Sequence, residues 1–300
     1  MPRSSFYNEI AANRNMTILL FGVFFVFLII LGIVFSYIMD SYLFVLIFGI
    51  IAAVYIIVAY YNSDKIVLAI SRARPATVEE FPRFVHTVEE MSIASGMKKP
   101  PRTYVIDDTA MNAFATGRDP DNSVICATTG LLKIMNREEL QGVVAHEMSH
   151  IMNRDILVMT MAAVMVGVSV LLSDFLLRMF LWGGIGGNRR DSGMFGIALI
   201  VLGIVLAALT PLIAQMIKFA ISRKREYLAD ATGAKLTRYP QGLASALRKI
   251  SGDNEVLEAA NKATAHMYIA NPLKGQKMWF KSMFATHPPL EDRIAKLEGM

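Results

Sequence analysis

Four long apolar runs constrain how this 300-residue chain can fold, because each is long enough to cross a lipid bilayer. They lie at about residues 16–39, 42–61, 156–182 and 194–221, and a transmembrane helix needs about 20 residues. The third run contains Asp174 and Arg178, which are one helical turn apart and can pair with each other. With 54% hydrophobic and 18% charged residues, the composition is also typical of a membrane protein. We therefore expect two transmembrane hairpins, and for the second, a pair of shallow re-entrant helices is the alternative to full crossing.

Positive residues predict which side of the membrane the soluble segments occupy. Basic residues flank the outer ends of the first hairpin at Arg3, Arg14, Lys65, Arg72 and Arg74. Because Lys and Arg are enriched in cytoplasmic flanks, the N-terminus and both soluble blocks are predicted to be cytoplasmic. The conflicting signal is Arg189 and Arg190, in a turn predicted to face outward. Such flanks account for the net charge of +5, which therefore predicts no nucleic-acid partner.

An H-E-x-x-H sequence, His146-Glu147-Met148-Ser149-His150, stands directly before the third run. On a helix the two histidines project from one face and can bind a single zinc ion. Glu147 is then placed to act as general base toward a zinc-activated water. Asn136 as N-cap, with Glu139 three residues later, predicts that this helix begins at about residue 136.

A catalytic zinc needs a third protein ligand and an open position for water. We predict that the ligand is Glu226, which opens the sequence Glu226-Tyr227-Leu228-Ala229-Asp230. Asp230, one turn later, is predicted to accept the spare ring N–H of a ligand histidine, with His146 the preferred partner. Two other histidines, His86 and His266, are expected on helix surfaces.

The ligands fall in two soluble blocks, so a single domain has to be assembled from both. The predicted division is a membrane hairpin at 1–61, a first part of the cytoplasmic domain at 62–155, a second hairpin at 156–221 and a second part at 222–300. Strands are predicted at 102–106, 112–116 and 123–127, and helices at about 78–95, 136–154, 241–250 and 255–266. This pattern indicates an α+β fold, mostly helical with a small antiparallel sheet.

Four segments, in order, resemble the HtpX-type membrane metalloproteases, which are kin to the CAAX prenyl endopeptidases. They are Asn112–Gly117, the motif at His146, Glu226–Asp230 and Thr286–Leu290. The resemblance implies a zincin-like domain that acts as a zinc endopeptidase in a prokaryotic inner membrane, with one zinc ion per chain. It also implies quality control and stress response by hydrolysis of misfolded or damaged membrane proteins, with cytosolic proteins as further candidates. Four predicted spans cannot build the large helical barrel of the prenyl endopeptidases, so prenyl-substrate processing is not implied.

The resemblance also suggests roles around the metal. Asn112, Ala113 and Phe114 are predicted to belong to an edge strand that binds extended substrate, the alternative being a plain hairpin strand. His287, in a His-Pro-Pro turn, is predicted to be catalytic through the oxyanion. Arg293 is predicted to contact substrate, the alternative being an exposed ion pair with Glu291 or Asp292.

The partners expected are polypeptide substrates, chiefly membrane proteins, and the lipid bilayer. Self-association and association with other membrane quality-control proteases stay open. Two further functions remain as alternatives: a protease that processes specific lipidated or membrane peptides, and a zinc-binding membrane scaffold or transporter that cleaves nothing. Glu147 argues against the latter, because a structural or transport site has no use for a general base between its histidines.

Overall fold

The computed structural model describes residues 6–38, 40–167, 223–260, 264–270, 272 and 288–300. The labelled helices are α1 (Phe6–Ile38), α2 (Leu43–Ile70), α3 (Pro82–Ala94), α4 (Thr129–Ile134), α5 (Arg137–Met152), α8 (Arg223–Thr237), α9 (Pro240–Gly252) and α11 (Leu290–Glu298), with 3₁₀ turns η1 (Pro120–Asn122) and η2 (Ala265–Met267). A further helix, Asp155–Gly167, follows α5. The strands are β1 (Arg74–Pro75), β2 (Arg102–Ile106), β3 (Ala113–Gly117) and β4 (Ser123–Thr128).

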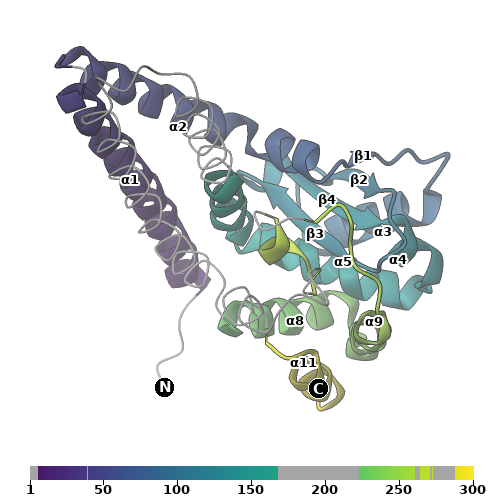
Figure 1. Ribbon diagram of the computed structural model, residues 1–300. Coiled ribbons are helices and arrows are strands. Elements are labelled where there is room, and N and C mark those ends of the chain that lie inside the picture. Colours follow the sequence, from purple (N-terminus) through teal and green to yellow (C-terminus); the bar gives the residue numbers. More distant parts are fainter. Residues whose placement is uncertain (1–5, 39, 168–222, 261–263, 271, 273–287) are drawn as a thin grey trace.

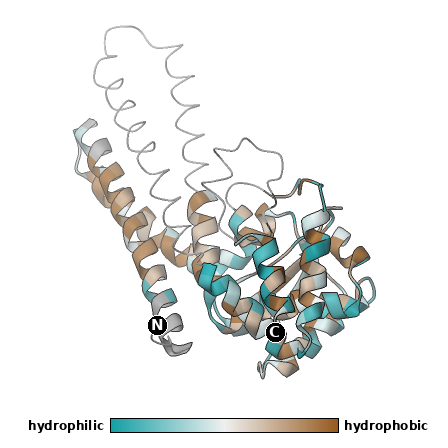
Figure 2. Cartoon of the chain, turned by 90° about the horizontal axis from the view of Figure 1, so that it is seen from below, coloured by the Kyte–Doolittle hydropathy of each residue, from teal (hydrophilic) through white to brown (hydrophobic). Residues whose placement is uncertain are grey.

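Helices α1 and α2 form an apolar hairpin that projects from a domain containing the sheet and the remaining labelled helices (Figure 1). Among the described residues, these two helices are long and apolar enough to cross a membrane, over Asn15–Ile33 and Leu43–Ile70. Most of the described hairpin is brown in Figure 2, the colour of hydrophobic residues. The first predicted hairpin therefore corresponds to two helices, although α2 continues to Ile70. A break in its helical dihedrals at Asn62 falls where the predicted span ends.

The two faces of α1 meet different surroundings. Leu20, Phe24 and Leu31 are buried in a cluster with residues of the helix Asp155–Gly167, which follows α5. Ile18, Val26 and Ile33 are exposed on the opposite side, as are many apolar residues of α2. A contiguous apolar surface of this kind is rare on a soluble protein and fits contact with lipid.

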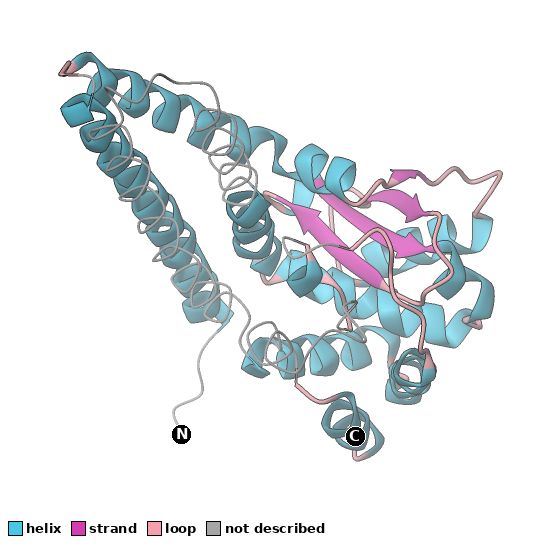
Figure 3. Ribbon diagram, viewed as in Figure 1, coloured by secondary structure: helices cyan, strands magenta, loops and turns pink. Residues whose placement is uncertain are grey.

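The sheet has the strand order β1-β2-β4-β3 and lies among the helices of the domain (Figure 3). It is mixed: β3 and β4 form the expected antiparallel hairpin, whereas β2 and β4 run parallel. An antiparallel sheet was expected throughout. Instead, the chain that leaves β2 first forms β3 and then returns as β4, which lies between β2 and β3. As a result β3 is an edge strand.

Helix α5 is the central element of the domain and packs against α3, α8, α9 and β3. Its start is fixed locally, as the sequence predicts: the Asn136 side chain accepts the Glu139 N–H at 2.8 Å, and the Glu139 carboxylate accepts the Asn136 N–H at 2.8 Å. Glu139 also accepts hydrogen bonds from Ser245 and Lys249 of α9, each at 2.7 Å. The same carboxylate thus begins α5 and anchors α9 to it.

Two glycines allow α5 and α9 to cross at very short range. A Cβ on Gly142 would lie 2.6 Å from the Leu243 backbone nitrogen, and one on Gly242 would lie 2.6 Å from the Glu138 carbonyl oxygen. Both obstacles are backbone atoms, so neither can be relieved by a side-chain rotation.

We therefore expect Gly142→Ala to destabilise the domain by about 1–3 kcal/mol or more, the range for overpacked cores. Thermal unfolding of the full-length protein measures this directly. Gly252→Ala, at the end of α9, is the matched control, because a Cβ there meets no atom within 4 Å. Equal melting temperatures for the two variants would contradict the close crossing.

Two segments differ from the prediction or fall outside the described residues, namely 255–266 and the part of 156–221 beyond residue 167. The helix expected at 255–266 is wrong for the described residues, where side-chain carboxylates bind the backbone instead: Asp253 accepts the Glu255 N–H and Asp108 accepts the Glu258 N–H, both at 2.9 Å. Such local bonds compete with helix formation. The second hairpin, expected at 156–221, lies outside the described residues beyond residue 167.

Candidate metal centre and active site

The structure brings His146, His150 and Glu226 together, with one ligand atom from each lying within 4.8 Å of the others. The Nε2 atoms of the two histidines are 3.3 Å apart. The Glu226 carboxylate oxygens lie 3.6 Å from Nε2 of His150 and 3.8 Å from Nε2 of His146. All three side chains are buried. Helix α5 supplies both histidines one turn apart, and α8, packed against it, supplies the glutamate.

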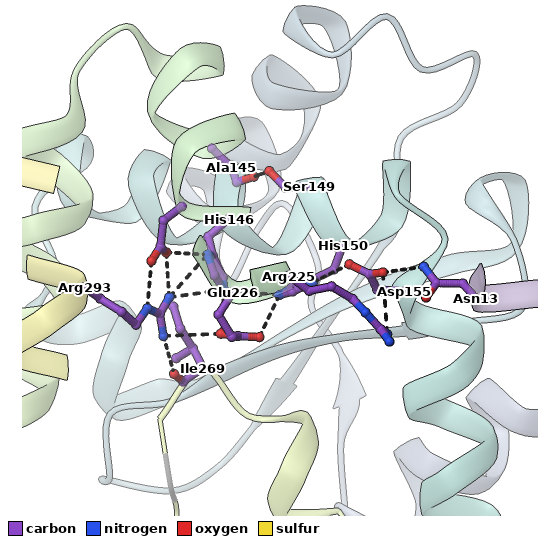
Figure 4. A network of polar contacts seen from close by, with 11 residues as sticks. Asn13, Ala145, His146, Ser149, His150, Asp155, Arg225, Glu226, Ile269 and Arg293 are labelled. Atoms are coloured by element: carbon purple, nitrogen blue, oxygen red, sulfur yellow. Dashed lines mark hydrogen bonds and ion pairs between the residues drawn. The ribbon is translucent and has the colours of Figure 1, made fainter. Parts of the chain in front are cut away.

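Asp230 orients the first histidine. Its Oδ1 lies 2.9 Å from Nδ1 of His146, and its predicted role beside a metal ligand stays a prediction. The carboxylate is held in turn by Arg293 of α11, whose Nε and Nη2 donate to it at 2.9 and 2.7 Å (Figure 4). A carboxylate on Nδ1 selects the tautomer that leaves Nε2 with a free lone pair.

Arg293 is completely buried, which excludes the alternative of an exposed ion pair with Glu291 or Asp292. Besides Asp230, it contacts the Ile269 carbonyl oxygen at 3.1 Å and Glu226 at 3.5 Å. The positive charge of Arg293 therefore lies next to the cluster of His146, His150 and Glu226. The predicted contact of Arg293 with substrate stays a prediction.

Asp155 contacts His150 as Asp230 contacts His146, with a carboxylate oxygen facing Nδ1 of the ring. Its Oδ2 lies 3.1 Å from Nδ1 of His150, and the carboxylate is buried. Asp155 was not among the site residues predicted from the sequence. A signal was present, because Asp155 is a lone acid at the start of an apolar run, five residues after His150.

Burial and charge shift the pKa values of the cluster in different directions. Burial, with the charge of Arg293, lowers the pKa of His146 to about 4 although Asp230 opposes this. Burial also opposes ionisation of His150, but the hydrogen bond to Asp155 and the charges of Glu226 and Glu147 raise its pKa to about 9. Burial raises the pKa of Glu147 to about 7. At neutral pH His150 therefore carries a proton in the metal-free protein, and a bound cation would replace it.

The donor set fits zinc. With Nδ1 of each histidine facing a carboxylate, both Nε2 lone pairs and the Glu226 carboxylate converge on one buried point. Ligand atoms about 2.0–2.1 Å from a tetrahedral zinc are about 3.3 Å from one another, and the two Nε2 atoms have that separation. Imidazole nitrogen and carboxylate oxygen are also the ligands of catalytic zinc sites.

The edge strand β3 runs beside this cluster, and a hydrogen bond from the Ala115 backbone reaches Glu147. Part of the edge is occupied by the chain itself: Ile269 N–H donates to the Ala113 carbonyl at 2.9 Å, and the Asn112 side chain donates to the Ala270 carbonyl at 3.0 Å. Phe114 is buried under β3 against Tyr268. Substrate binding along Asn112–Phe114 therefore remains a prediction.

The other histidines do not join the cluster among the described residues. His86 is exposed on α3, as expected. His266 was expected on a helix surface but is buried in η2, with Nε2 at 3.0 Å from the Met159 carbonyl oxygen. His287 lies outside the described residues.

Comparison with known proteins gives a family match. The model of peptidase family M48 matches residues 78–300. Among the similar curated proteins, the protease HtpX homolog of Caldanaerobacter subterraneus is 46% identical, covering 100% of this chain and 99% of the relative. That of Dictyoglomus thermophilum is 46% identical, covering 100% and 96%. That of Streptococcus uberis is 40% identical, covering 98% and 99%.

A solved structure is also similar. The crystal structure of S. mikatae Ste24p aligns with a TM-score of 0.50 and 19% identity, covering 91% of this chain. This chain spans 62% of the Ste24p chain's length, and at that identity the likeness concerns the fold alone. The zincin-like α+β fold expected from the sequence is confirmed, as is the resemblance to HtpX-type proteases.

Proposed function

The chain belongs to peptidase family M48, and from that premise we propose that it is an integral membrane zinc endopeptidase that cleaves misfolded or damaged membrane proteins. The observation that carries the proposal is the buried cluster of His146, His150 and Glu226 with Glu147 on the same helix. A non-catalytic scaffold or transporter does not account for that fourth residue, and family membership makes the chain a metallopeptidase.

His146, His150 and Glu226 would hold the metal, with Asp230 and Asp155 orienting the two imidazoles. When bound, zinc supplies Lewis-acid polarisation of the scissile carbonyl and lowers the pKa of a water. Glu147 accepts the proton of the attacking water and returns it to the leaving amine. In the metal-free protein burial raises the pKa of this carboxyl to about 7, and the charge of a bound zinc ion would favour the ionised form that accepts a proton. The backbone N–H of Ala115 holds this carboxylate toward the β3 edge.

The placement in the membrane is supported by where the hairpin touches the domain. Asn13, near the start of α1, hydrogen-bonds Asp155, and Asp64, near the end of α2, pairs with Arg102 of β2. Both open ends of the hairpin thus lie on the side of the metal cluster. With the basic flanks, this supports a cytoplasmic N-terminus and catalytic domain in an inner membrane.

The proposed function is tested with the full-length protein in proteoliposomes and a labelled, destabilised membrane protein as substrate. We expect internal peptide bonds of the substrate to be cleaved, a zinc chelator to stop cleavage, and one equivalent of zinc to restore it. Cleavage that persists after complete zinc removal would refute the proposal.

Zinc binding should also be linked to pH through His150. Its pKa of about 9 in the metal-free protein means that the ring must lose a proton to bind zinc at pH 8. The apparent zinc affinity should therefore rise about tenfold per pH unit from about 7.5 to 9 and then level off. Titration calorimetry at pH 8, in two buffers of different ionisation enthalpy, should report release of about one proton. A release near zero would contradict a raised pKa of His150 in the metal-free protein.

A further inference from the structure

Asn13 connects the first apolar helix to the metal cluster. It lies on α1, two residues before the candidate span Asn15–Ile33, yet its side chain is only 2% exposed. Its amide nitrogen donates to Oδ1 of Asp155 at 2.6 Å (Figure 4). The same nitrogen also donates to the carbonyl oxygen of Asn153 at 3.2 Å. Asn153 is the C-cap of α5, so one side chain of α1 contacts the end of the helix that carries both histidines.

The two oxygens of Asp155 face different partners. Oδ1 accepts from Asn13, while Oδ2 faces Nδ1 of His150 at 3.1 Å. Arg225 stands farther off, with Nη1 at 3.9 Å from Oδ1. Because Asp155 is 2% exposed, water cannot readily replace the amide if it is removed. Among these partners Asn13 makes the short hydrogen bond that orients the carboxylate, while Arg225 contributes a longer ion pair.

The two histidines thus face carboxylates that are held by different parts of the molecule. Asp230, on His146, is held by Arg293 from within the domain. Asp155, on His150, is held by a residue of the membrane hairpin. Outer hydrogen-bond partners of ligand histidines fix the tautomer and ring orientation, and their loss typically costs about 10- to 100-fold in metal affinity or activity.

We propose that Asn13 is a positioning residue that couples docking of helix α1 to assembly of the zinc site, through Asp155 and His150. The inference rests on the proposed zinc function. It makes the N-terminal hairpin part of the active-site scaffold in addition to its role in the membrane.

The test uses the full-length protein in detergent, with zinc affinity measured by chelator competition and ligand geometry by the visible spectrum of the Co²⁺-substituted protein. Asn13→Ala should weaken zinc binding about tenfold or more and change the cobalt spectrum. Asn13→Asp preserves shape while removing the donor and adding a like charge beside Asp155, so it should weaken binding further. Asn15→Ala, an exposed asparagine on the same helix, is the matched control and should match the wild type.

A double-mutant cycle separates positioning from general destabilisation. In an Asp155→Ala background, Asn13→Ala should have no further effect on zinc affinity, because its route to His150 is already gone. Additive losses, or unchanged zinc affinity and cobalt spectrum in both Asn13 variants, would overturn the inference while leaving the zinc site standing. A wild type that takes up no stoichiometric zinc would overturn both.

Discussion

Glu147→Gln is expected to bind zinc at wild-type stoichiometry and to lose about 10²- to 10⁴-fold in kcat, the range for removal of a general acid–base. Glu147 directly follows His146 on α5, but it is not one of the three residues proposed as zinc ligands, His146, His150 and Glu226. Glutamine keeps the size of the side chain while removing the group that accepts a proton. Zinc content by elemental analysis and single-turnover peptide cleavage measure the two effects separately.

Glu138→Gln is the matched control, since it makes the same change at an exposed position in the first turn of the same helix. It should leave both zinc content and kcat unchanged. Wild-type cleavage by the Glu147 variant would contradict its assignment as general base, and so would loss of its zinc.

Glu226→Ala is expected to lose zinc, with affinity falling by more than about 100-fold. Removal of an outer hydrogen-bond partner already costs about 10- to 100-fold, and this carboxylate is predicted to bind the metal itself. Its removal also leaves the buried charge of Arg293, 3.5 Å away, with one neutralising carboxylate fewer. Zinc affinity by chelator competition and melting with and without added zinc measure the loss.

His287→Ala gives the informative contrast. Because His287 is predicted to act on the oxyanion, this variant should retain zinc and cleave more slowly. Glu291→Ala, at an exposed position on α11, should change neither. If Glu226→Ala held full zinc while His287→Ala held none, the two roles would have to be exchanged.

The parts of the site that could be predicted from sequence are those determined locally. The capping box at Asn136, the spacing of His146 and His150, and the turn between Glu226 and Asp230 all lie within a few residues. Helical geometry alone places each pair on one face. The strand ranges at 102–106 and 123–127 follow from the same kind of local signal.

The rest depends on how distant segments dock. Arg293 looks like an ordinary residue of a charged helix, and only the packing of α11 buries it against Asp230. Asn13 and Asp155 are 142 positions apart and share no motif. The parallel pairing of β2 with β4 follows from the path of the chain, which the composition of neither strand specifies. The one available signal in the sequence was Asp155, a lone acid at the start of an apolar run five residues after His150.

We propose above all that one zinc ion is bound by two imidazoles and one carboxylate. Zinc K-edge X-ray absorption of the full-length protein tests this most directly. The expected result is one zinc per chain with only nitrogen and oxygen neighbours, at about 2.0–2.2 Å, and the outer-shell scattering of two imidazole rings. Sulfur in the first shell, or no imidazole scattering, would contradict the account.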